Sequence, residues 1–301
     1  MRRIDGGEIH RVYAGAPTHD VRCAGLSIHC AWGARYELRL DERALAFDDE
    51  VFVVAAPQRR VRGRLLARKT SCALTICYPP GAAAHLLAEL PPGWHAGWRE
   101  RDGELWPTEH IRPHRRSTEL LLRFIASQID DELDDPSWYE EQSLFLLQRL
   151  LWGDLRANDG SEWAQIARPT VRSALLRRLA RVTDLIHSEY ERRLTLADFA
   201  TTANLSMFHA LRSLKLLHGM TPCEFLQRRR LSAGLWMLGS TNEPVGAIAE
   251  RVGFADRRAF YRQVARQCGL RPHELNRHQA QKSGGPHGPP RIEHGEARVA
   301  S

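Results

Sequence analysis

Two arginines near the C-terminus, Arg212 and Arg262, occupy matching positions in a segment that occurs twice. In each copy a short polar residue, Ser206 or Asp256, stands six residues before the arginine. The planar guanidinium of arginine donates two parallel hydrogen bonds, which match the two acceptors on the major-groove edge of guanine. Arginines at this repeated spacing favour the reading of nucleic-acid bases over catalysis.

Each copy of the segment is predicted to be a short helix, a tight turn, a second helix and a Gly-x-x-Pro stop. The turn contains Asn204 in the first copy and Gly253 in the second. A sharp turn between helices needs one residue with positive φ, for which glycine is best suited and asparagine next best. The stops begin at Gly219 and Gly269. Because different residues meet the same backbone requirement, we interpret the copies as two helix-turn-helix units.

The second helix of each unit is the candidate recognition helix. We predict these helices at 207–217, after the N-cap Ser206, and at 257–267, after the N-cap Asp256. The N-terminal residues of such a helix contact base edges, where arginine suits guanine and apolar side chains suit thymine methyl groups. The candidate DNA-contacting residues are Phe208, Leu211, Arg212 and Lys215 in the first helix and Arg257, Arg258, Tyr261 and Arg262 in the second.

Two further helices are expected to hold the units. A linking helix at about 222–238 starts with Thr221 at the N-cap and Glu224 three residues later, which is the pattern of a capping box. A rigid link would hold the recognition helices about 34 Å apart, one turn of the double helix. For the arginines at 228–230 two roles are left open, phosphate contact and a solvated charge run. The opening helix at 171–190 has an apolar stripe of Leu175, Leu179, Val182 and Ile186.

The formal charge of +7 is unevenly distributed along the 301 residues. Residues 168–278 hold 19 Lys and Arg against 9 Asp and Glu, whereas residues 1–167 hold 21 against 25. A basic C-terminal half is typical of a DNA-binding domain attached to a domain that does not touch DNA. The sequence has no apolar run of about eighteen residues and no apolar signal segment, so we expect a cytoplasmic location and no membrane partner.

The N-terminal half shows two patterns. Residues 9–80 alternate between apolar and polar side chains, for example at Leu26, Ile28 and Cys30, which favours a small antiparallel sandwich or barrel. Two helices with apolar stripes follow at about 116–157 and form a hairpin that needs a covering surface. Both the β domain and a second copy of the chain are left open as that surface. The stripes are Leu121, Ile125, Ile129 and Leu133, then Leu144, Leu147, Leu151 and Leu155.

Residues 170–278 resemble the AraC/XylS family of transcriptional regulators. The resemblance implies a seven-helix domain whose two helix-turn-helix units enter successive segments of the major groove, with the candidate recognition residues reading bases. It also implies a cupin-like β-barrel followed by dimerising helices, a plan that residues 9–157 fit. The most specific motif is Ile248-Ala249-x3-Gly253-Phe254-x5-Phe260-x-Arg262, closed by Gly269-x-x-Pro272.

The predicted fold class is therefore α+β, with an N-terminal cupin-like antiparallel β-barrel and helical hairpin, and a C-terminal all-α domain. The predicted divisions are 1–160 for the effector and dimerisation domain, 161–170 for a linker, 171–278 for the DNA-binding domain and 279–301 for a disordered tail.

No enzymatic constellation is recognised, so we expect neither catalysis nor a metal or cofactor. The six cysteines are interpreted as small buried apolar residues, with redox sensing by Cys23/Cys30 or Cys72/Cys77 left open, and Cys30 and Cys77 as the first candidates for a thiol acceptor. An effector pocket formed by aromatic residues is one hypothesis, and an ordinary aromatic core is the other. The aromatic candidates are Trp32, Tyr36, Phe52 and Tyr78.

The predicted function is that of a sequence-specific DNA-binding transcriptional regulator, with activation and repression both left open. Its expected partner is double-stranded DNA. A small-molecule effector, RNA polymerase and a second copy of the chain are left open as further partners. The alternatives are a thiol-based or redox-sensing regulator and a non-specific architectural DNA-binding protein, which would show similar, strongly salt-dependent affinity for any duplex.

Overall fold

The computed structural model describes most of the chain. The predicted tail at 279–301, the second Gly-x-x-Pro stop and positions 161–168 of the predicted linker lie outside the described residues. The described residues are 2–4, 7–16, 18–66, 71–88, 99–101, 104–106, 109–114, 116–131, 133–158, 169–241 and 243–268.

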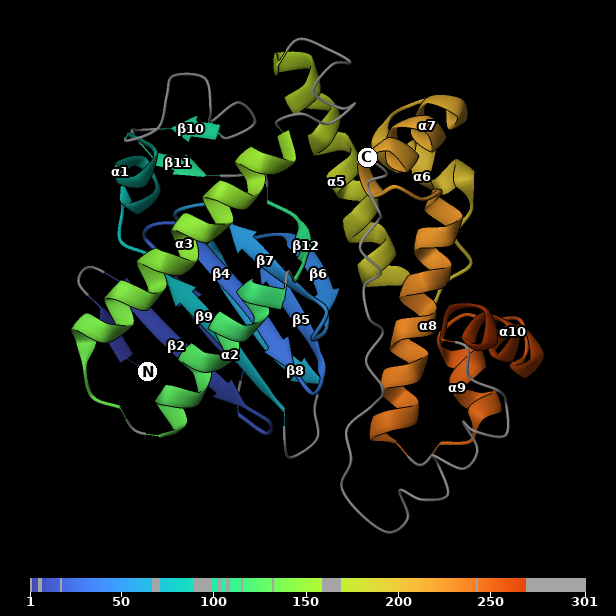
Figure 1. The fold of residues 1–301 in the computed structure, drawn as a ribbon, viewed down its shortest axis with the longest axis horizontal. Coiled ribbons are helices and arrows are strands. Elements are labelled where there is room, and N and C mark those ends of the chain that lie inside the picture. Colours follow the sequence, from blue (N-terminus) through green and yellow to red (C-terminus); the bar gives the residue numbers. More distant parts are fainter. Residues whose placement is uncertain are drawn as a thin grey trace, which may run out of the picture. The chain divides into compact units, whose positions relative to one another are not determined.

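The chain divides into two compact units (Figure 1). The N-terminal unit comprises residues 1–188 with 202–204, and the C-terminal unit comprises residues 189–201 with 205–301. The division lies in the last turn of α5 (Pro169–Glu189), so most of this helix packs with the N-terminal unit.

The strands of the N-terminal unit are antiparallel, as the alternating pattern predicted. One sheet has the order β1-β2-β9-β4-β7-β12, a second has the order β3-β8-β5-β6, and β10 pairs with β11. Among the described strands no pairing joins the two larger sheets, so the predicted closed barrel is instead a pair of sheets. The strands are β1 (Arg2–Ile4), β2 (Gly7–Tyr13), β3 (His19–Arg22), β4 (Ser27–Trp32), β5 (Arg35–Leu40), β6 (Arg43–Phe47), β7 (Val51–Ala55), β8 (Arg60–Leu66), β9 (Cys72–Cys77), β10 (Arg99–Arg101), β11 (Glu104–Trp106) and β12 (Ile111–Pro113).

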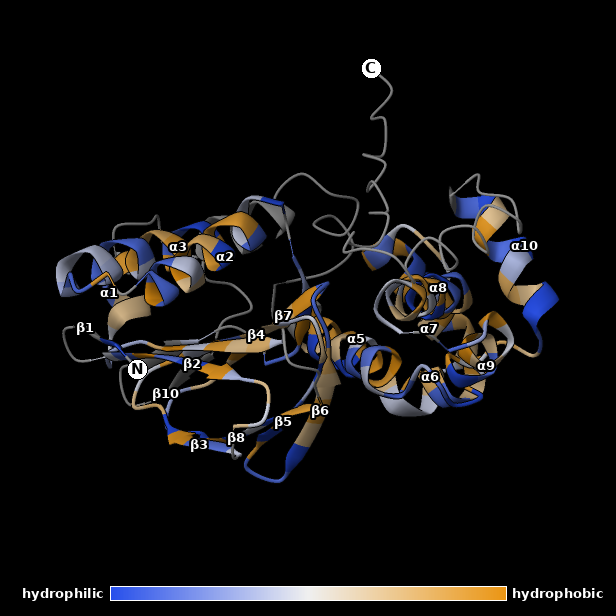
Figure 2. Ribbon diagram, turned by 90° about the horizontal axis from the view of Figure 1, so that it is seen from below, coloured by the Kyte–Doolittle hydropathy of each residue, from blue (hydrophilic) through white to orange (hydrophobic). Residues whose placement is uncertain are grey.

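The two larger sheets face each other, with helices covering the other side of the six-stranded sheet (Figure 2). Side chains alternate along β5, where Tyr36, Leu38 and Leu40 are buried and the residues between them are exposed. The inward set packs against Val53 and Ile111 from the opposite sheet. The period-two pattern of the sequence therefore builds an apolar layer between the sheets.

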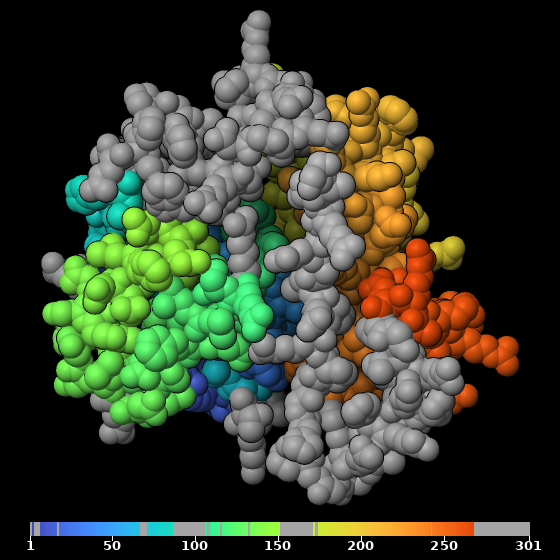
Figure 3. Space-filling view, viewed as in Figure 1, coloured from blue at the N-terminus to red at the C-terminus, as the bar shows by residue number. Residues whose placement is uncertain are grey.

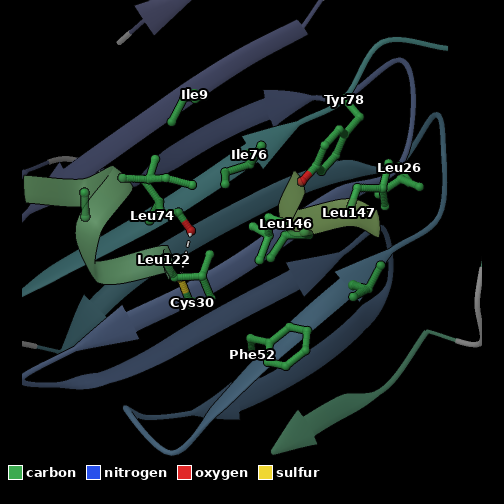
Figure 4. Packing of buried hydrophobic residues seen from close by; sticks show 14 of the residues in the cluster. Ile9, Leu26, Cys30, Phe52, Leu74, Ile76, Tyr78, Leu122, Leu146 and Leu147 are labelled. Atoms are coloured by element: carbon green, nitrogen blue, oxygen red, sulfur yellow. Dashed lines mark hydrogen bonds between the residues drawn. The ribbon is translucent and has the colours of Figure 1, made fainter. Parts of the chain in front are cut away.

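The helical hairpin consists of α2 (Arg116–Asp130) and α3 (Pro136–Asn158), and a short α1 (Ala82–Ala88) precedes it. Leu122, Ile125 and Leu146 are fully buried against the outer face of the six-stranded sheet, which supplies Leu74 and Ile76 (Figure 4). The sequence left open whether the β domain or a second copy of the chain covers the hairpin. In the structure the β domain covers it.

Helix α5 is joined to the sheets by polar contacts as well as by packing. Asp184 is buried and accepts a hydrogen bond of 2.7 Å from the Ile111 amide, and it pairs with the guanidinium of Arg43. Burial raises the pKa of Asp184 to about 6. The Ser188 hydroxyl accepts a hydrogen bond of 3.1 Å from the Ala46 amide. These contacts attach α5 to strands β6 and β12 just before the chain enters the C-terminal unit.

The structure joins Cys23 and Cys77 in a disulfide, with their Cα atoms 5.2 Å apart. This bond contradicts the interpretation of all six cysteines as small buried apolar residues, as does the exposed Cys223, and it matches neither redox pair left open by the sequence. The reason is the side of the six-stranded sheet on which each cysteine lies. Cys23 and Cys77 pack in the layer between the sheets, whereas Cys30 on β4 and Cys72 on β9 face the helices. Burial raises the pKa of the Cys30 thiol, which makes it a poor nucleophile.

A row of polar side chains crosses the inner face of the six-stranded sheet. His10, Thr75 and His29 are direct cross-strand neighbours on β2, β9 and β4. His29 is fully buried, and its ring nitrogens lie 2.9 Å from the Ser27 hydroxyl and 3.0 Å from the Thr75 hydroxyl. Burial lowers the pKa of His29 to about 3, so this imidazole is neutral in the folded chain.

The buried neutral His29 is expected to contribute to acid sensitivity of the N-terminal unit. In the unfolded chain His29 takes up a proton near its ordinary pKa of 6.5, whereas the folded chain does so only near 3. The contribution of neutral His29 to the free energy of unfolding is therefore fully present above pH 6.5 and is lost as the pH falls towards 3. Replacing His29→Gln should reduce the acid-induced loss of unfolding free energy by about 1.4 kcal/mol per pH unit.

Urea unfolding of wild type and variant between pH 6.5 and 4.5 measures this difference. The matched control is His209→Gln, an exposed histidine in the C-terminal unit, which should leave the pH dependence of the N-terminal unit unchanged. An unchanged pH dependence in His29→Gln would mean that the folded chain protonates His29 as readily as the unfolded chain.

Candidate DNA-binding interface

The first helix-turn-helix unit consists of α6 (Leu196–Ala203) and α7 (Met207–His218). Asn204 in the turn has a φ of 51°, as the sequence predicted for this position. The Ser206 hydroxyl accepts a hydrogen bond of 3.3 Å from the His209 amide and so caps α7. Gly219 ends the helix with a φ of 69°. Local side-chain chemistry therefore fixes both ends of the first recognition helix.

The second unit consists of α9 (Val245–Arg251) and α10 (Arg257–Cys268). Gly253 adopts a φ of 90° in the turn, and the Asp256 carboxylate caps α10 by accepting a hydrogen bond of 2.7 Å from the Ala259 amide. The rings of Phe254 and Phe260 meet edge to face, with centroids 5.3 Å apart. The start of the second recognition helix is thus fixed in the same way as the start of the first, by a turn residue with positive φ and a side-chain N-cap.

The two recognition helices bury equivalent positions. Ala210 and Leu214 in α7 are buried, as are Phe260 and Val264 in α10. The candidate residues occupy the other side of each helix, and α10 lies open to the surface in Figure 3 (red-orange). Phe208 is 75% exposed, Leu211 and Tyr261 are half-buried, and the charged candidates Arg212, Lys215, Arg257, Arg258 and Arg262 are exposed.

Charge on the exposed side of α10 is not neutralised within the described residues. Arg258 and Arg262 are four residues apart on one face, and no carboxylate there pairs with either of them. Like charges at this spacing destabilise a helix by about 0.2–0.5 kcal/mol, a cost that an anionic partner would remove. The guanidinium of Arg257 lies 5.9 Å from the ring centroid of Tyr261, which orients it along the helix.

Two exposed residues of α7 were missed by the sequence reasoning. Met207 is 56% exposed, and His209 is exposed as well. Both lie in the first turn after the cap, where a recognition helix meets base edges. The alignment of the two caps could have found Met207, since it places this residue opposite Arg257.

Helix α8 (Pro222–Ser240) links the two helix-turn-helix units and is buried on most of its surface. The predicted capping box is present, because Thr221 and Glu224 bond each other's backbone amides. Arg230 donates hydrogen bonds of 2.8 and 2.6 Å to the carbonyls of Tyr190 and Arg192. Helix α8 is therefore fastened to the segment that enters the C-terminal unit.

The structure corrects the roles considered for two of the three arginines at 228–230. Arg229 and Arg230 are 2% and 7% exposed, so they are neither phosphate contacts nor a solvated charge run. The guanidinium of Arg229 stacks 4.4 Å from the ring centroid of Tyr190. Arg230 packs against Gly253, where an added Cβ atom would lie 2.8 Å from its Nε atom. Gly253 is thus required both by its positive φ and by the close approach of Arg230.

Close packing between α8 and α10 depends on a second glycine. A Cβ atom added to Gly234 would lie 2.6 Å from the fully buried ring of Phe260. Without a side chain at this position, the linking helix approaches the second recognition helix directly.

Replacing Gly234→Ala is therefore expected to destabilise the C-terminal unit by about 1–3 kcal/mol, because the added methyl group overlaps the fully buried ring of Phe260. The matched control is Gly246→Ala in α9, where an added Cβ atom meets nothing within 4 Å. That variant should be neutral or more stable by up to about 1 kcal/mol. Thermal unfolding of both variants checks the difference, and equal stability would contradict the close packing.

The four aromatic effector candidates do not come together in the N-terminal unit. Tyr36 faces the layer between the sheets, where its ring meets Phe47 edge to face. Trp32, Phe52 and Tyr78 belong to the core on the opposite side of the six-stranded sheet, beneath the helices. Among the described residues no group of three or more His, Cys, Asp or Glu is placed to hold a metal ion.

The C-terminal part of the chain matches known sequences. Residues 199–278 match the protein family described as "Helix-turn-helix domain". The chain is 25% identical over 155 residues to YisR, an uncharacterized HTH-type transcriptional regulator of Bacillus subtilis (strain 168), and the match covers 52% of each protein. It is 31% identical over 91 residues to the bifunctional transcriptional activator/DNA repair enzyme AdaA of the same organism, covering 30% of this chain and 43% of AdaA. The chain thus spans about half the length of these relatives.

Solved structures also match. The C-terminal domain of AraT, a response regulator from Geobacillus stearothermophilus, is 27% identical with a TM-score of 0.33, over 34% of this chain and 86% of that one. The DNA-binding domain of AdpA, solved with a target DNA, is 23% identical with a TM-score of 0.33, over 36% of this chain and 98% of that one. ToxT from Vibrio cholerae is 12% identical with a TM-score of 0.36, over 90% of this chain and 97% of that one.

The family match and the two aligned units together define residues 199–278 as a helix-turn-helix domain of the class that binds DNA. This match agrees with the resemblance of residues 170–278 to the AraC/XylS family that the sequence motifs indicate. Within the described residues, no helix has the length and apolar character needed to cross a membrane.

Proposed function

We propose that the whole chain is a sequence-specific transcriptional regulator that binds double-stranded DNA in the cytoplasm through residues 171–278. The observation that supports this proposal best is the pair of capped helices, α7 and α10, which expose cationic side chains while α8 links them. In this proposal the eight candidate residues of α7 and α10 face the major groove.

The N-terminal unit would serve as the regulatory domain. Two facing sheets with a polar row between them are compatible with a cupin-like effector domain at 1–160, followed by a linker at 161–170. Tyr36 is the one aromatic candidate that faces this interior. In the proposal a small effector there would act on the DNA-binding domain through α5, which Asp184 attaches to the sheets.

Dimerisation through the hairpin at 116–157 is part of the proposal. Leu120, Phe124 and Phe145 are 55%, 48% and 45% exposed on α2 and α3, although other residues of these helices are buried against the sheet. Apolar side chains of this size on adjacent helices are suited to a second copy of the chain. RNA polymerase is a further partner in this proposal, since it is the machinery on which a transcriptional regulator acts.

Thiol chemistry is the less favoured alternative, because Cys30 is buried with a raised pKa and Cys77 is bonded to Cys23. The proposal therefore contains no enzymatic activity, although the partial relative AdaA is described as bifunctional. Non-specific architectural binding remains the competing function, and the following experiment separates it from regulation.

Single replacements Arg212→Ala and Arg262→Ala should each weaken binding to the preferred DNA site by about 1–3 kcal/mol, because a bidentate contact to a base would be lost. Binding to unrelated duplexes should change much less. The measurement is the affinity of the full chain for a duplex selected from a random pool and for a scrambled duplex, over a series of salt concentrations.

Arg64→Ala is the matched control, since it removes one exposed positive charge from β8 in the N-terminal unit. It should leave the preference between the two duplexes unchanged. If Arg212→Ala and Arg262→Ala lowered affinity equally for all duplexes and reduced only the salt dependence, both arginines would be phosphate contacts. If wild type selected no sequence at all, the architectural alternative would hold.

A further inference from the structure

The two recognition helices have the same geometry but opposite chemistry at their first turn. Alignment of the caps Ser206 and Asp256 places Met207 opposite Arg257 and Phe208 opposite Arg258. All four side chains are exposed, so the difference lies at the surface and not in the core. Apolar groups begin one helix where arginines begin the other.

Exposure of Phe208 has no structural explanation within the first unit. The core of α7 is completed by Ala210 and Leu214, both buried, while Phe208 leaves 75% of its surface open to solvent. Met207 beside it is 56% exposed. Two adjacent large apolar side chains at the tip of a capped recognition helix form a surface suited to an apolar partner group.

The major groove offers one such group. The C5-methyl of thymine is an apolar feature there, and apolar side chains contact it. Guanine presents two acceptors, O6 and N7, which arginine pairs with in a bidentate manner. The apolar first turn of α7 is therefore suited to contact thymine, and the first turn of α10, with its arginines, is suited to contact guanine.

We propose that α7 reads thymine methyl groups through Met207 and Phe208, whereas α10 reads guanine through Arg258 and Arg262. The preferred DNA site then has two chemically distinct parts. Thymines lie under the first turn of α7, beside the base that Arg212 contacts, and guanines lie under α10. This inference rests on the proposed function and adds which base group each helix recognises. It also adds Met207 to the residues that determine specificity.

The test uses the full chain and a duplex selected by it from a random pool. Each thymine is replaced in turn by deoxyuridine, which lacks only the methyl group, and each guanine by 7-deazaguanine, which lacks the N7 acceptor. Loss of one contacted methyl should lower affinity about fourfold, as expected for the burial of one such group. Loss of N7 at a contacted guanine should lower affinity about tenfold.

Variants then assign each sensitive base to a helix. In Phe208→Ala the deoxyuridine effect should vanish at the affected thymines while the 7-deazaguanine effect persists. In Arg258→Ala the pattern should reverse. Phe208→Leu keeps an apolar side chain and should retain most of the methyl effect, and because the replaced residues are exposed, thermal unfolding should match the wild type.

The outcomes separate the inference from the proposed function. A selected site with no thymine sensitive to deoxyuridine, or with sensitivity that persists in Phe208→Ala, would overturn the methyl reading and leave sequence-specific binding intact. Persistence of the 7-deazaguanine effect at every sensitive guanine in both Arg258→Ala and Arg262→Ala would overturn the guanine reading by α10. Failure of the wild type to select any site would overturn the proposed function and the inference with it.

Discussion

The arrangement of helices in the C-terminal unit depends on one buried interaction, a clasp made of the two hydrogen bonds from Arg230 to the carbonyls of Tyr190 and Arg192. A buried guanidinium is tolerable only because these acceptors satisfy it. The same side chain lies against Gly253, so it connects the entry segment, the linking helix and the second turn. The orientation of α10 relative to α8 follows from this clasp together with the packing of Phe260 on Gly234. In the proposed function, two recognition helices held by one rigid helix would contact one face of DNA without the entropy loss of ordering a flexible linker.

The N-terminal unit combines an apolar frame with polar groups that carry no structural necessity of their own. The row that contains His29 lies in the layer between its sheets, where replacing paired polar groups with apolar groups of the same shape can be nearly neutral or stabilising. Its connection to α5 is likewise polar, through the buried carboxylate of Asp184. Polar contacts of this kind are directional, so they can define one docked arrangement of the helix. This arrangement is compatible with the regulatory role proposed for the N-terminal unit.

Sequence reasoning succeeded where the determinants are local. The cap at Ser206, the capping box at Thr221, and the positive φ of Asn204 and Gly253 are each set within a few residues. It failed where residues meet from distant parts of the chain. Nothing near residue 229 or 230 distinguishes a buried arginine from a solvated one, because the acceptors lie about forty residues earlier. The bond between Cys23 and Cys77 and the separation of the aromatic candidates depend on strand register, which alternation alone does not determine.

The central claim is that α8 holds the two recognition helices at a fixed separation, and its most direct test is the dependence of DNA affinity on spacing. Duplexes would carry the selected site with about five base pairs, half a turn, inserted between the parts read by α7 and α10. If α8 holds the helices rigidly, affinity should fall to that of a duplex in which one part has been scrambled. Affinity unchanged by the insertion would contradict a rigid frame, because it would show that the two units reach their bases independently.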